Sequence, residues 1–326
     1  MALKAPPRFA LGCVPTPLER AERLERAVGC SPLYIKRDDL IGFALAGNKT
    51  RLLEFLIADA LERGCTVLLT GGGAASSYCQ GAAIAAAVAG LRCVLVMYGE
   101  EPVIPHPNLA LARAAGAAVR FTGADARESV DGALEAVEVE LRDAGEIPYL
   151  APRGGATAVA ALGYAQAAAE LDEQLATVGV AAETVLVAVG SGVTQAGLLA
   201  GSQAAGDPWR LVGASVSRPR PEAFAQVLRL ASECAELLGA GPPEPARVDV
   251  RDARGPGYGM PSPEGERAAR IALRAGGIIV DPVFTAKAFA LLPDVAKEGR
   301  GGPTVFWHTG GIPVALAHAV GRPSPS

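Results

Sequence analysis

The chain has 326 residues, of which 50% are hydrophobic and 20% charged. This composition is typical of a globular protein with one large or two modest domains, and it excludes a disordered chain. The net charge is −4, and the 30 basic and 34 acidic residues are spread along the chain without a basic patch rich in aromatic residues. Nucleic acid is therefore not an expected partner.

Neither a membrane nor a metal is an expected partner. The longest alanine-rich apolar run covers residues 81–90, which is too short to span a bilayer, and residues 1–8 lack the apolar core of a secretory signal. Six cysteines without a CxxC pair, together with three histidines, argue against a zinc site or a disulfide framework. We expect a cytoplasmic protein with buried thiols, although Cys79 follows a polar loop and is the one thiol to watch.

Strand-like and helix-like segments alternate in the first half of the chain. Apolar runs predict strands at 32–36, 66–70, 92–97 and 118–121, and helical patterns predict helices at 51–63, 77–89, 108–115 and 129–144. This alternation predicts βαβ units, and hence a parallel sheet with helices on both faces.

The same pattern continues in the second half. Helices are expected at 158–175, 194–205, 221–238, 263–275 and 286–292, and strands at 184–189, 210–216 and 304–308. Proline and glycine cluster at 239–245 and 253–263, which predicts loops. The tail from Gly321 is rich in proline and serine, and we expect it to be frayed.

Three glycine-containing loops precede predicted helices and carry polar side chains. Lys49 lies between Gly47 and the helix at 51–63, and residues 190–194 and 71–77 each follow an apolar strand. Taken alone, Lys49 is an ordinary surface charge and a glycine turn is a tight connection. Together, a lysine that can form a Schiff base and a Gly/Ser/Thr loop that can hold a phosphate indicate pyridoxal phosphate. The loops at 71–77 and 190–194 match neither the P-loop nor the dinucleotide fingerprint.

Two further segments are candidates for the same site. Tyr258 is flanked by glycines, so its ring either packs as part of a turn or covers a cofactor or substrate. The segment 281–287 is interpreted as the end of a strand that leads into a helix, and 308–311 follows the last predicted strand. Catalytic groups gather at the carboxyl ends of parallel strands, so both segments are well placed.

These motifs, in this order, resemble the fold-type II pyridoxal-phosphate enzymes. The nearest group contains 1-aminocyclopropane-1-carboxylate deaminase, D-cysteine desulfhydrase and L-cysteate sulfo-lyase. The resemblance extends from about Phe9 to His318 and rests on the motifs at 16–19, 35–39, 47–51, 190–197, 258–261, 281–283 and 308–311. It implies a two-domain α/β fold like that of the tryptophan synthase β chain, with parallel-rich sheets and helices on both faces. The large cofactor domain would comprise residues 1–49 and 161–326, and the small domain residues 50–160.

The resemblance also implies roles for individual residues. Lys49 would form the Schiff base with the cofactor and move protons at the substrate Cα, and Asn48 would hydrogen-bond the 3-hydroxyl of the cofactor. Catalytic roles fall to Lys49, Ser76 and Tyr258, and substrate binding falls to Ser76, Ser77, Tyr78, Tyr258 and Phe284. The cofactor phosphate would be held by Gly190, Ser191, Gly192, Val193 and Thr194. Thr285 or Thr309 would lie near the pyridine nitrogen, where a neutral hydroxyl favours elimination.

Several positions depart from the family pattern, and they cluster around the substrate. Ser77 stands where the family has asparagine, and Phe284 where it has tyrosine. The cyclopropane-opening deaminase has a Tyr-Glu pair where this chain has Phe284 and Thr285, so cyclopropane opening is disfavoured. Ala156 and Thr157 replace a segment that resembles Ser-Asn in the family.

The sequence therefore predicts a pyridoxal-phosphate lyase that acts on a small amino acid with a β leaving group, releasing keto acid and ammonia as cysteine desulfhydrases do. Three alternatives stay open: β-replacement, a biosynthetic enzyme for an unusual amino acid, and a cofactor-binding protein without catalysis. A homodimer is expected from the resemblance alone.

Overall fold

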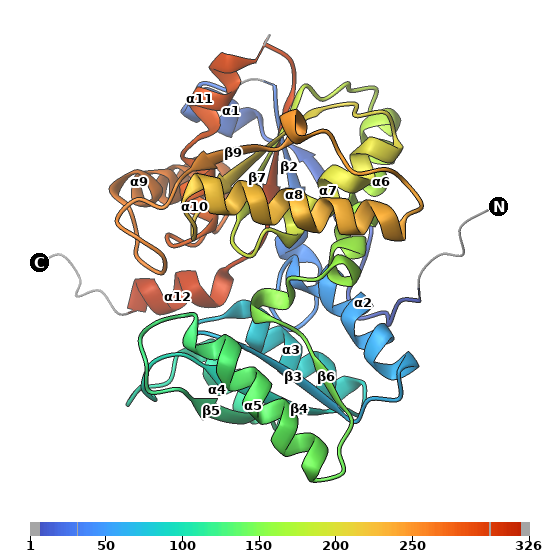
Figure 1. Cartoon of the computed structure of the whole chain (residues 1–326). Helices are drawn as coiled ribbons and strands as arrows, with labels where there is room; N and C mark the ends of the chain where they lie inside the picture. The colour runs from blue at the N-terminus through green and yellow to red at the C-terminus, as the bar shows by residue number, and fades with distance from the viewer. Residues whose placement is uncertain (1–6, 31, 300, 321–326) are drawn as a thin grey trace, which may run out of the picture.

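The chain forms two separate sheets with helices packed around them. The computed structural model describes residues 7–30, 32–299 and 301–320. One sheet has six strands in the order β1-β2-β10-β7-β8-β9, and the other has four in the order β5-β4-β3-β6. Figure 1 shows the six-stranded sheet in the upper part of the molecule and the four-stranded sheet in the lower part. The predicted α/β class with parallel-rich sheets is confirmed.

The six-stranded sheet is parallel except at one edge. Its strands are β1 (Leu18–Arg20), β2 (Leu33–Arg37), β7 (Thr184–Val189), β8 (Arg210–Ser215), β9 (Asp249–Asp252) and β10 (Thr304–His308). Only β1 pairs antiparallel, with β2. All five residues of β10 are buried, as expected of a strand covered on both faces of a sheet.

The four-stranded sheet is parallel throughout. Its strands are β3 (Val67–Gly72), β4 (Arg92–Met97), β5 (Ala118–Phe121) and β6 (Pro148–Leu150). β3 is longer than predicted and includes Gly71 and Gly72, so the glycine loop begins only at Gly73.

The helices follow the predicted order. They are α1 (Glu22–Val28), α2 (Lys49–Glu62), α3 (Ser77–Val88), α4 (Pro107–Ala114), α5 (Ser129–Asp143), α6 (Ala158–Thr177), α7 (Val193–Ala204), α8 (Arg220–Leu237), α9 (Pro263–Ile271), α10 (Thr285–Phe289), α11 (Leu292–Glu298) and α12 (Ile312–Val320). Short 3-10 turns lie at η1 (Asp38–Leu40), η2 (Arg153–Gly155) and η3 (Pro245–Arg247), and η4 (Ala272–Gly276) is a π-helical turn. No helix within the described residues has the length and apolar composition to cross a bilayer.

Close packing of α6 against α7 depends on small residues. A Cβ atom placed on Gly197 of α7 would lie 2.1 Å from the carbonyl oxygen of Ala161 on α6. Any side chain at this position would force the two helices apart and open voids in the core. The packing fixes α7, whose first turn forms part of the candidate site.

The structure differs from the predicted elements in a few places. The sequence does not predict β1, α1, β6, β9 or α11. The expectation that Asp281 lies at the end of a strand is wrong, because residues 277–281 join no sheet. Instead, Nε2 of His308 on β10 lies 3.1 Å from the carbonyl oxygen of Ile279. The helix predicted at 286–292 ends at Phe289, and Pro293 lies in the first turn of the next helix.

Two predictions are not decided by these elements. The domain boundaries at 49/50 and 160/161 stay predictions, although β3 to β6 all fall between them. The frayed tail from Gly321 lies outside the described residues.

Candidate active site

A cleft between the two sheets brings together most of the predicted site residues. Its walls come from the loops at the carboxyl ends of strands of both sheets, as is usual for ligand sites in parallel α/β proteins. The predicted residues that line it are Asn48, Lys49, Ser76, Ser77, Tyr78, Gly190, Ser191, Thr194, Tyr258, Phe284, Thr285 and Thr309. Gly192 and Val193 do not line the cleft, and the side chain of Val193 is buried in the core.

Lys49 is the first residue of α2 and follows a turn that requires glycine. Gly47 has φ +59°, and a Cβ atom on it would lie 2.4 Å from the carbonyl oxygen of Thr309. The backbone N–H of Asn48 donates to that same oxygen at 3.1 Å. The turn therefore fixes the start of α2 against the loop that follows β10, and Lys49 faces the cleft.

The amine of Lys49 is suited to act as a nucleophile or a base. Its Nζ donates to Oδ1 of Asn48 at 2.7 Å. Burial lowers the pKa of Lys49 to about 8, although the negative charges of Asp281 and Asp38 oppose this shift. More of the amine is therefore neutral near neutral pH than in an exposed lysine, and only a neutral amine can add to an aldehyde or accept a proton.

Asn48 connects Lys49 to the glycine loop on the opposite wall. Its Nδ2 donates to Oγ1 of Thr194 at 3.1 Å, while its Oδ1 accepts from Lys49. The hydroxyl of Tyr164 on α6 donates to the carbonyl oxygen of Asn48 at 2.9 Å. Asn48 is fully buried, so these contacts hold its amide in one orientation.

The loop between β7 and α7 offers free N–H groups for an anion. Gly192 has φ +94° and lets the chain turn into α7, which begins at Val193. Within the part of the chain that the structure describes, the N–H groups of Ser191 and Gly192 donate to no protein acceptor. The first N–H groups of a helix also lack intrahelical acceptors, and the helix dipole favours negative charge there. Val193 thus contributes its backbone alone.

Thr285 and Thr309 lie together at the far end of the cleft. Their hydroxyl oxygens are 3.3 Å apart, and Oγ1 of Thr285 donates to the carbonyl oxygen of Gly310 at 3.0 Å. Asp281 lies behind them and accepts the N–H groups of residues 283, 284 and 285. Burial raises the pKa of Asp281, while these hydrogen bonds act in the opposite direction. The Asp281 carboxylate thereby stabilises the turn that begins α10.

The first turn of α3 leaves the N–H groups of Ser77 and Tyr78 without a protein acceptor among the described residues. Ser76 is the N-cap, and its Oγ accepts the N–H of Cys79 at 3.1 Å. Behind Ser77, the buried side chain of Asn108 donates to the carbonyl oxygen of Ala75 at 2.8 Å and lies 3.3 Å from Oγ of Ser77. Asn108 thus supports the turn in which Ser77 replaces the family's asparagine. Asn108 lies on α4, and the sequence alone does not predict it as a residue of the site.

Cys79 is not available as a reactive thiol. Its side chain is buried on α3 and does not line the cleft. Burial raises the pKa of Cys79 to about 11, so the thiol stays protonated at neutral pH.

Aromatic side chains from different elements line the cleft. Tyr258 and Phe284 meet edge to face with ring centroids 5.7 Å apart. The hydroxyl of Tyr78 lies 3.0 Å from Oγ1 of Thr70, and this hydrogen bond fixes the orientation of the Tyr78 side chain. Burial raises the pKa of Tyr258 to about 12, so its hydroxyl is neutral and can donate a hydrogen bond.

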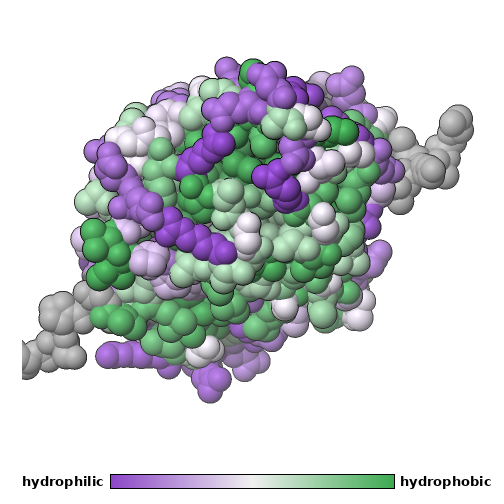
Figure 2. Space-filling view, turned by 90° about the horizontal axis from the view of Figure 1, so that it is seen from below, coloured by the Kyte–Doolittle hydropathy of each residue, from purple (hydrophilic) through white to green (hydrophobic). Residues whose placement is uncertain are grey.

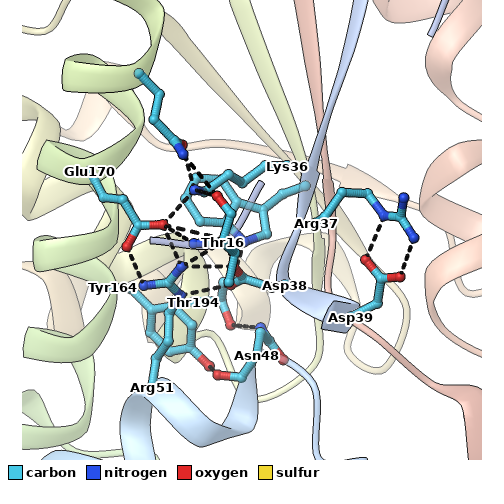
Figure 3. A network of polar contacts seen from close by, with 12 residues as sticks. Thr16, Lys36, Arg37, Asp38, Asp39, Asn48, Arg51, Tyr164, Glu170 and Thr194 are labelled. Atoms are coloured by element: carbon cyan, nitrogen blue, oxygen red, sulfur yellow. Dashed lines mark hydrogen bonds and ion pairs between the residues drawn. The ribbon is translucent and has the colours of Figure 1, made fainter. Parts of the chain in front are cut away.

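A buried polar network surrounds Arg51 and joins it to Asp38, Glu170 and Lys36 (Figure 3). Arg51, two residues after Lys49, donates to both carboxylate oxygens of Asp38 at 2.8 and 2.9 Å and to both of Glu170 at 2.9 and 3.0 Å. Lys36 pairs with Glu170. Burial alone would raise the pKa of Asp38, but the attraction of Arg51 outweighs burial and leaves it below its usual value. The network joins α2 to β2 and α6.

Three arginines that line the cleft were not predicted from the sequence. Arg127, Arg153 and Arg218 line it, each from a loop or turn that follows a strand: β5, β6 and β8. In the sequence each arginine comes just after a strand, which is where ligand-binding residues gather in parallel sheets. The sequence does not show that the three loops converge.

Comparison with known proteins gives a consistent result. Residues 10–310 match the family model described as pyridoxal-phosphate dependent enzyme. A putative 1-aminocyclopropane-1-carboxylate deaminase from Pyrococcus abyssi is 39% identical over 94% of this chain and 92% of its own length. A D-cysteine desulfhydrase from Salmonella choleraesuis is 36% identical over 96% of each chain.

Solved structures agree with this result. The crystal structure of a homologue of ACC deaminase matches with a TM-score of 0.89 and 35% identity, covering 96% of this chain and 94% of that one. The crystal structure of a threonine deaminase from T.th. matches with a TM-score of 0.67 at 19% identity over 91% and 92% of the two chains, which shows a shared fold.

Proposed function

This chain belongs to the pyridoxal-phosphate-dependent enzymes, and from that premise we propose that it is a lyase that eliminates a β substituent from a small amino acid. The observation that carries the proposal is the position of Lys49, whose amine faces the cleft with a lowered pKa, between two sites for anions. The products would be a keto acid, ammonia and the released substituent.

The residues of the cleft fit pyridoxal phosphate. The free N–H groups of Ser191 and Gly192 suit its phosphate, and the amine of Lys49 suits its aldehyde. Asn48 is close enough to Lys49 to hydrogen-bond a group beside that aldehyde. The Thr285 and Thr309 hydroxyls would face the ring nitrogen. When bound, the cofactor supplies an electron sink for the electron pair left at Cα.

Lys49 would carry the proton in the reaction. The neutral amine accepts the proton of Cα, the Cβ–X bond breaks, and its electron pair leaves with X as a double bond forms between Cα and Cβ. A proton then adds to Cβ, the double bond moves to between Cα and nitrogen, and water replaces the nitrogen, which gives the keto acid and ammonia. Asn48 holds the amine by accepting its hydrogen bond at 2.7 Å, so the amine returns to one position after each transfer.

The first turn of α3 would hold the substrate carboxylate. Ser77 and Tyr78 lie in this turn, where N–H groups lack intrahelical acceptors and the helix dipole favours an anion. Ser76 and Tyr258 line the same cleft as Lys49 and would orient the substrate and its leaving group.

The direct test is the release of keto acid and ammonia by the purified holoenzyme from D-cysteine, L-cysteine, L-cysteate and O-acetylserine. Turnover of at least one of them, and its loss in Lys49→Ala, is the expected result. A holoenzyme that releases keto acid from none of these amino acids would overturn the elimination proposal.

A second candidate is β-replacement or another biosynthetic reaction on an unusual amino acid. It is favoured by Ser77 and Phe284, which line the cleft and lack the amide and hydroxyl usual in the family. Adding a thiol to the reaction with O-acetylserine distinguishes the two, because replacement consumes the thiol and yields a new amino acid in place of ammonia.

We further propose that cyclopropane opening is not the activity. Phe284 provides no acid or base, and the Thr285 hydroxyl is engaged with the carbonyl oxygen of Gly310. Incubation with 1-aminocyclopropane-1-carboxylate should release no ammonia above background.

We propose a homodimer in the cytoplasm. Large apolar side chains are exposed before α4 at Val103 and Ile104, and on α12 at Leu316 and Val320. Figure 2 shows a broad hydrophobic area bordered by hydrophilic side chains on the lower face of the molecule. Light scattering should give the mass of two chains, and Ile104→Glu should reduce the measured mass.

All six cysteines are free thiols, which suits a reducing compartment such as the cytoplasm.

A further inference from the structure

The positive charge of the cleft exceeds what the cofactor and the substrate's α-carboxylate need. The loop at 190–194 provides N–H groups for a phosphate, and the first turn of α3 provides them for a carboxylate. Arg127, Arg153 and Arg218 line the same cleft in addition. Asp281 also lines it, but its oxygens already accept three backbone N–H groups.

Two of these arginines have no acidic partner. Arg153 is paired with Asp131 through two hydrogen bonds of 2.7 Å. Across the part of the chain that the structure describes, no carboxylate lies within 4.0 Å of the side-chain nitrogens of Arg127 or Arg218. The burial of Arg218 and the nearby charges of Arg127 and Arg153 lower the pKa of its guanidinium, although the carboxylate of Glu222 acts in the opposite direction. The three cations therefore lie close enough to repel one another.

Both unpaired arginines are held in place by neutral groups. The guanidinium carbon of Arg127 lies 3.8 Å from the ring centroid of Tyr258, which is a cation–π contact. Arg218 donates to the carbonyl oxygen of Gly190 at 2.7 Å, at the start of the glycine loop. Neutral contacts orient a guanidinium without cancelling its charge, so donors stay free for an anion.

The two side chains approach from different sides of the cleft. Arg127 precedes α5 beside the four-stranded sheet, and Arg218 follows β8 of the six-stranded sheet. Nη1 of Arg127 lies 3.4 Å from the carbonyl oxygen of Ser217, so the two loops already meet. An oxyanion between two guanidinium forks would receive charge-assisted hydrogen bonds from both sheets.

We propose that Arg127 and Arg218 bind a second acidic group on the substrate, so that the enzyme takes amino acids whose side chain ends in a sulfonate, phosphate or carboxylate. The proposal rests on the proposed function, because it places the amino acid in the same cleft. It narrows the substrate class from any small amino acid to dianionic ones. The competing source of the anion is the cofactor's own phosphate.

Aspartate and asparagine provide a matched pair of probes. They have nearly the same size, differ in side-chain charge and carry no β leaving group. Calorimetric titration of the holoenzyme with both enantiomers of each should give a dissociation constant about 10- to 100-fold lower for aspartate. Raising the ionic strength should weaken aspartate binding more than asparagine binding.

Variants assign the preference to the arginines. Arg127→Gln and Arg218→Gln should each reduce the aspartate preference, and the double variant should abolish it. Arg127→Lys keeps the charge, loses the fork and should be intermediate. Arg142→Gln, on the exposed side of α5, is the control and should bind both ligands as the wild type does.

Each outcome is decisive. Equal binding of aspartate and asparagine, or no binding of either, overturns the inference. So does a loss of pyridoxal-phosphate affinity in the variants with the aspartate preference intact, which would assign the arginines to the cofactor phosphate. Keto acid release is measured separately. Release from uncharged substrates without an aspartate preference would leave the proposed function standing alone, whereas an aspartate preference without any release would leave only the anion site.

Discussion

The two charged regions beside Lys49 are built in opposite ways. Behind it, Arg51 and Lys36 meet Asp38 and Glu170, so two positive charges face two negative charges in a buried network. In front of it, Arg127 and Arg218 face the cleft without an acidic partner among the described residues. A balanced network stabilises one arrangement of the chain, whereas unpaired cations are left for a ligand to neutralise. The balance of charge therefore distinguishes the region that holds the fold from the region that binds.

The largest expected effect is at the residue between these regions. Lys49→Ala removes the amine that would carry the Cα proton, and turnover should fall by at least about 10²- to 10⁴-fold. The fold should persist, because in the described structure the side chain of Lys49 hydrogen-bonds only to Asn48. Steady-state keto acid release measures the change. Lys297→Ala, at an exposed lysine, is the control, and normal turnover in Lys49→Ala would contradict the mechanism.

Breaking the balanced network should cost stability. Arg51→Met leaves the carboxylates of Asp38 and Glu170 without their main partner, and the free energy of unfolding should fall by about 3–5 kcal/mol. Arg63→Met, directly after the same helix, removes an exposed ion pair with Asp59 and a cation–π contact with Tyr149, and it should cost at most about 1 kcal/mol. Urea denaturation of both variants measures the difference. Equal losses would show that the buried network has no special role.

Removing an unpaired arginine should weaken ligand binding and leave the stability of the fold nearly unchanged. Arg127→Gln should lower the free energy of unfolding by no more than about 1 kcal/mol, because a cation–π contact with Tyr258 is lost but no ion pair is. The same variant should lose affinity for aspartate. If it instead unfolds as readily as Arg51→Met, Arg127 is a structural residue, and the contrast between the two regions fails.

The pH dependence of cofactor attachment should report the environment of Lys49. Its pKa of about 8 means that the neutral amine, which attacks the aldehyde, increases as pH rises through about 8. The rate of pyridoxal-phosphate attachment to the apoenzyme should rise through that pH and then level off. A midpoint near 10, roughly the value of a free lysine, would contradict this.

Asp281→Asn provides the matched test of this pKa. The Asp281 carboxylate raises the pKa of Lys49, so its removal should shift the midpoint of attachment to lower pH. Absorbance of the bound cofactor across a pH series measures both midpoints. An upward shift would mean that Asp281 does not act on Lys49 through its charge.

Much of the fold and the core of the site could be predicted from the sequence. Periodicity located the main helices and strands, because apolar repeats of helical or strand spacing are local properties of the chain. The glycine turn before Lys49 and the loop at 190–194 are contiguous motifs whose chemistry is carried by adjacent residues. The short elements β1, β6, β9, α1 and α11 were not predicted, because three or four residues in a strand, or seven in a helix, carry little periodic signal.

Only the tertiary structure decided which distant side chains meet. Arg127, Arg153 and Arg218 follow three different strands, and their convergence depends on how the two sheets face each other. Asn108 supports the turn at Ser77 from another helix. The order of strands in a sheet and the contact between sheets are set by the packing of the whole chain, which no short segment encodes. The sequence by itself therefore determined the cofactor chemistry, and the tertiary structure decided which charged side chains line the cleft.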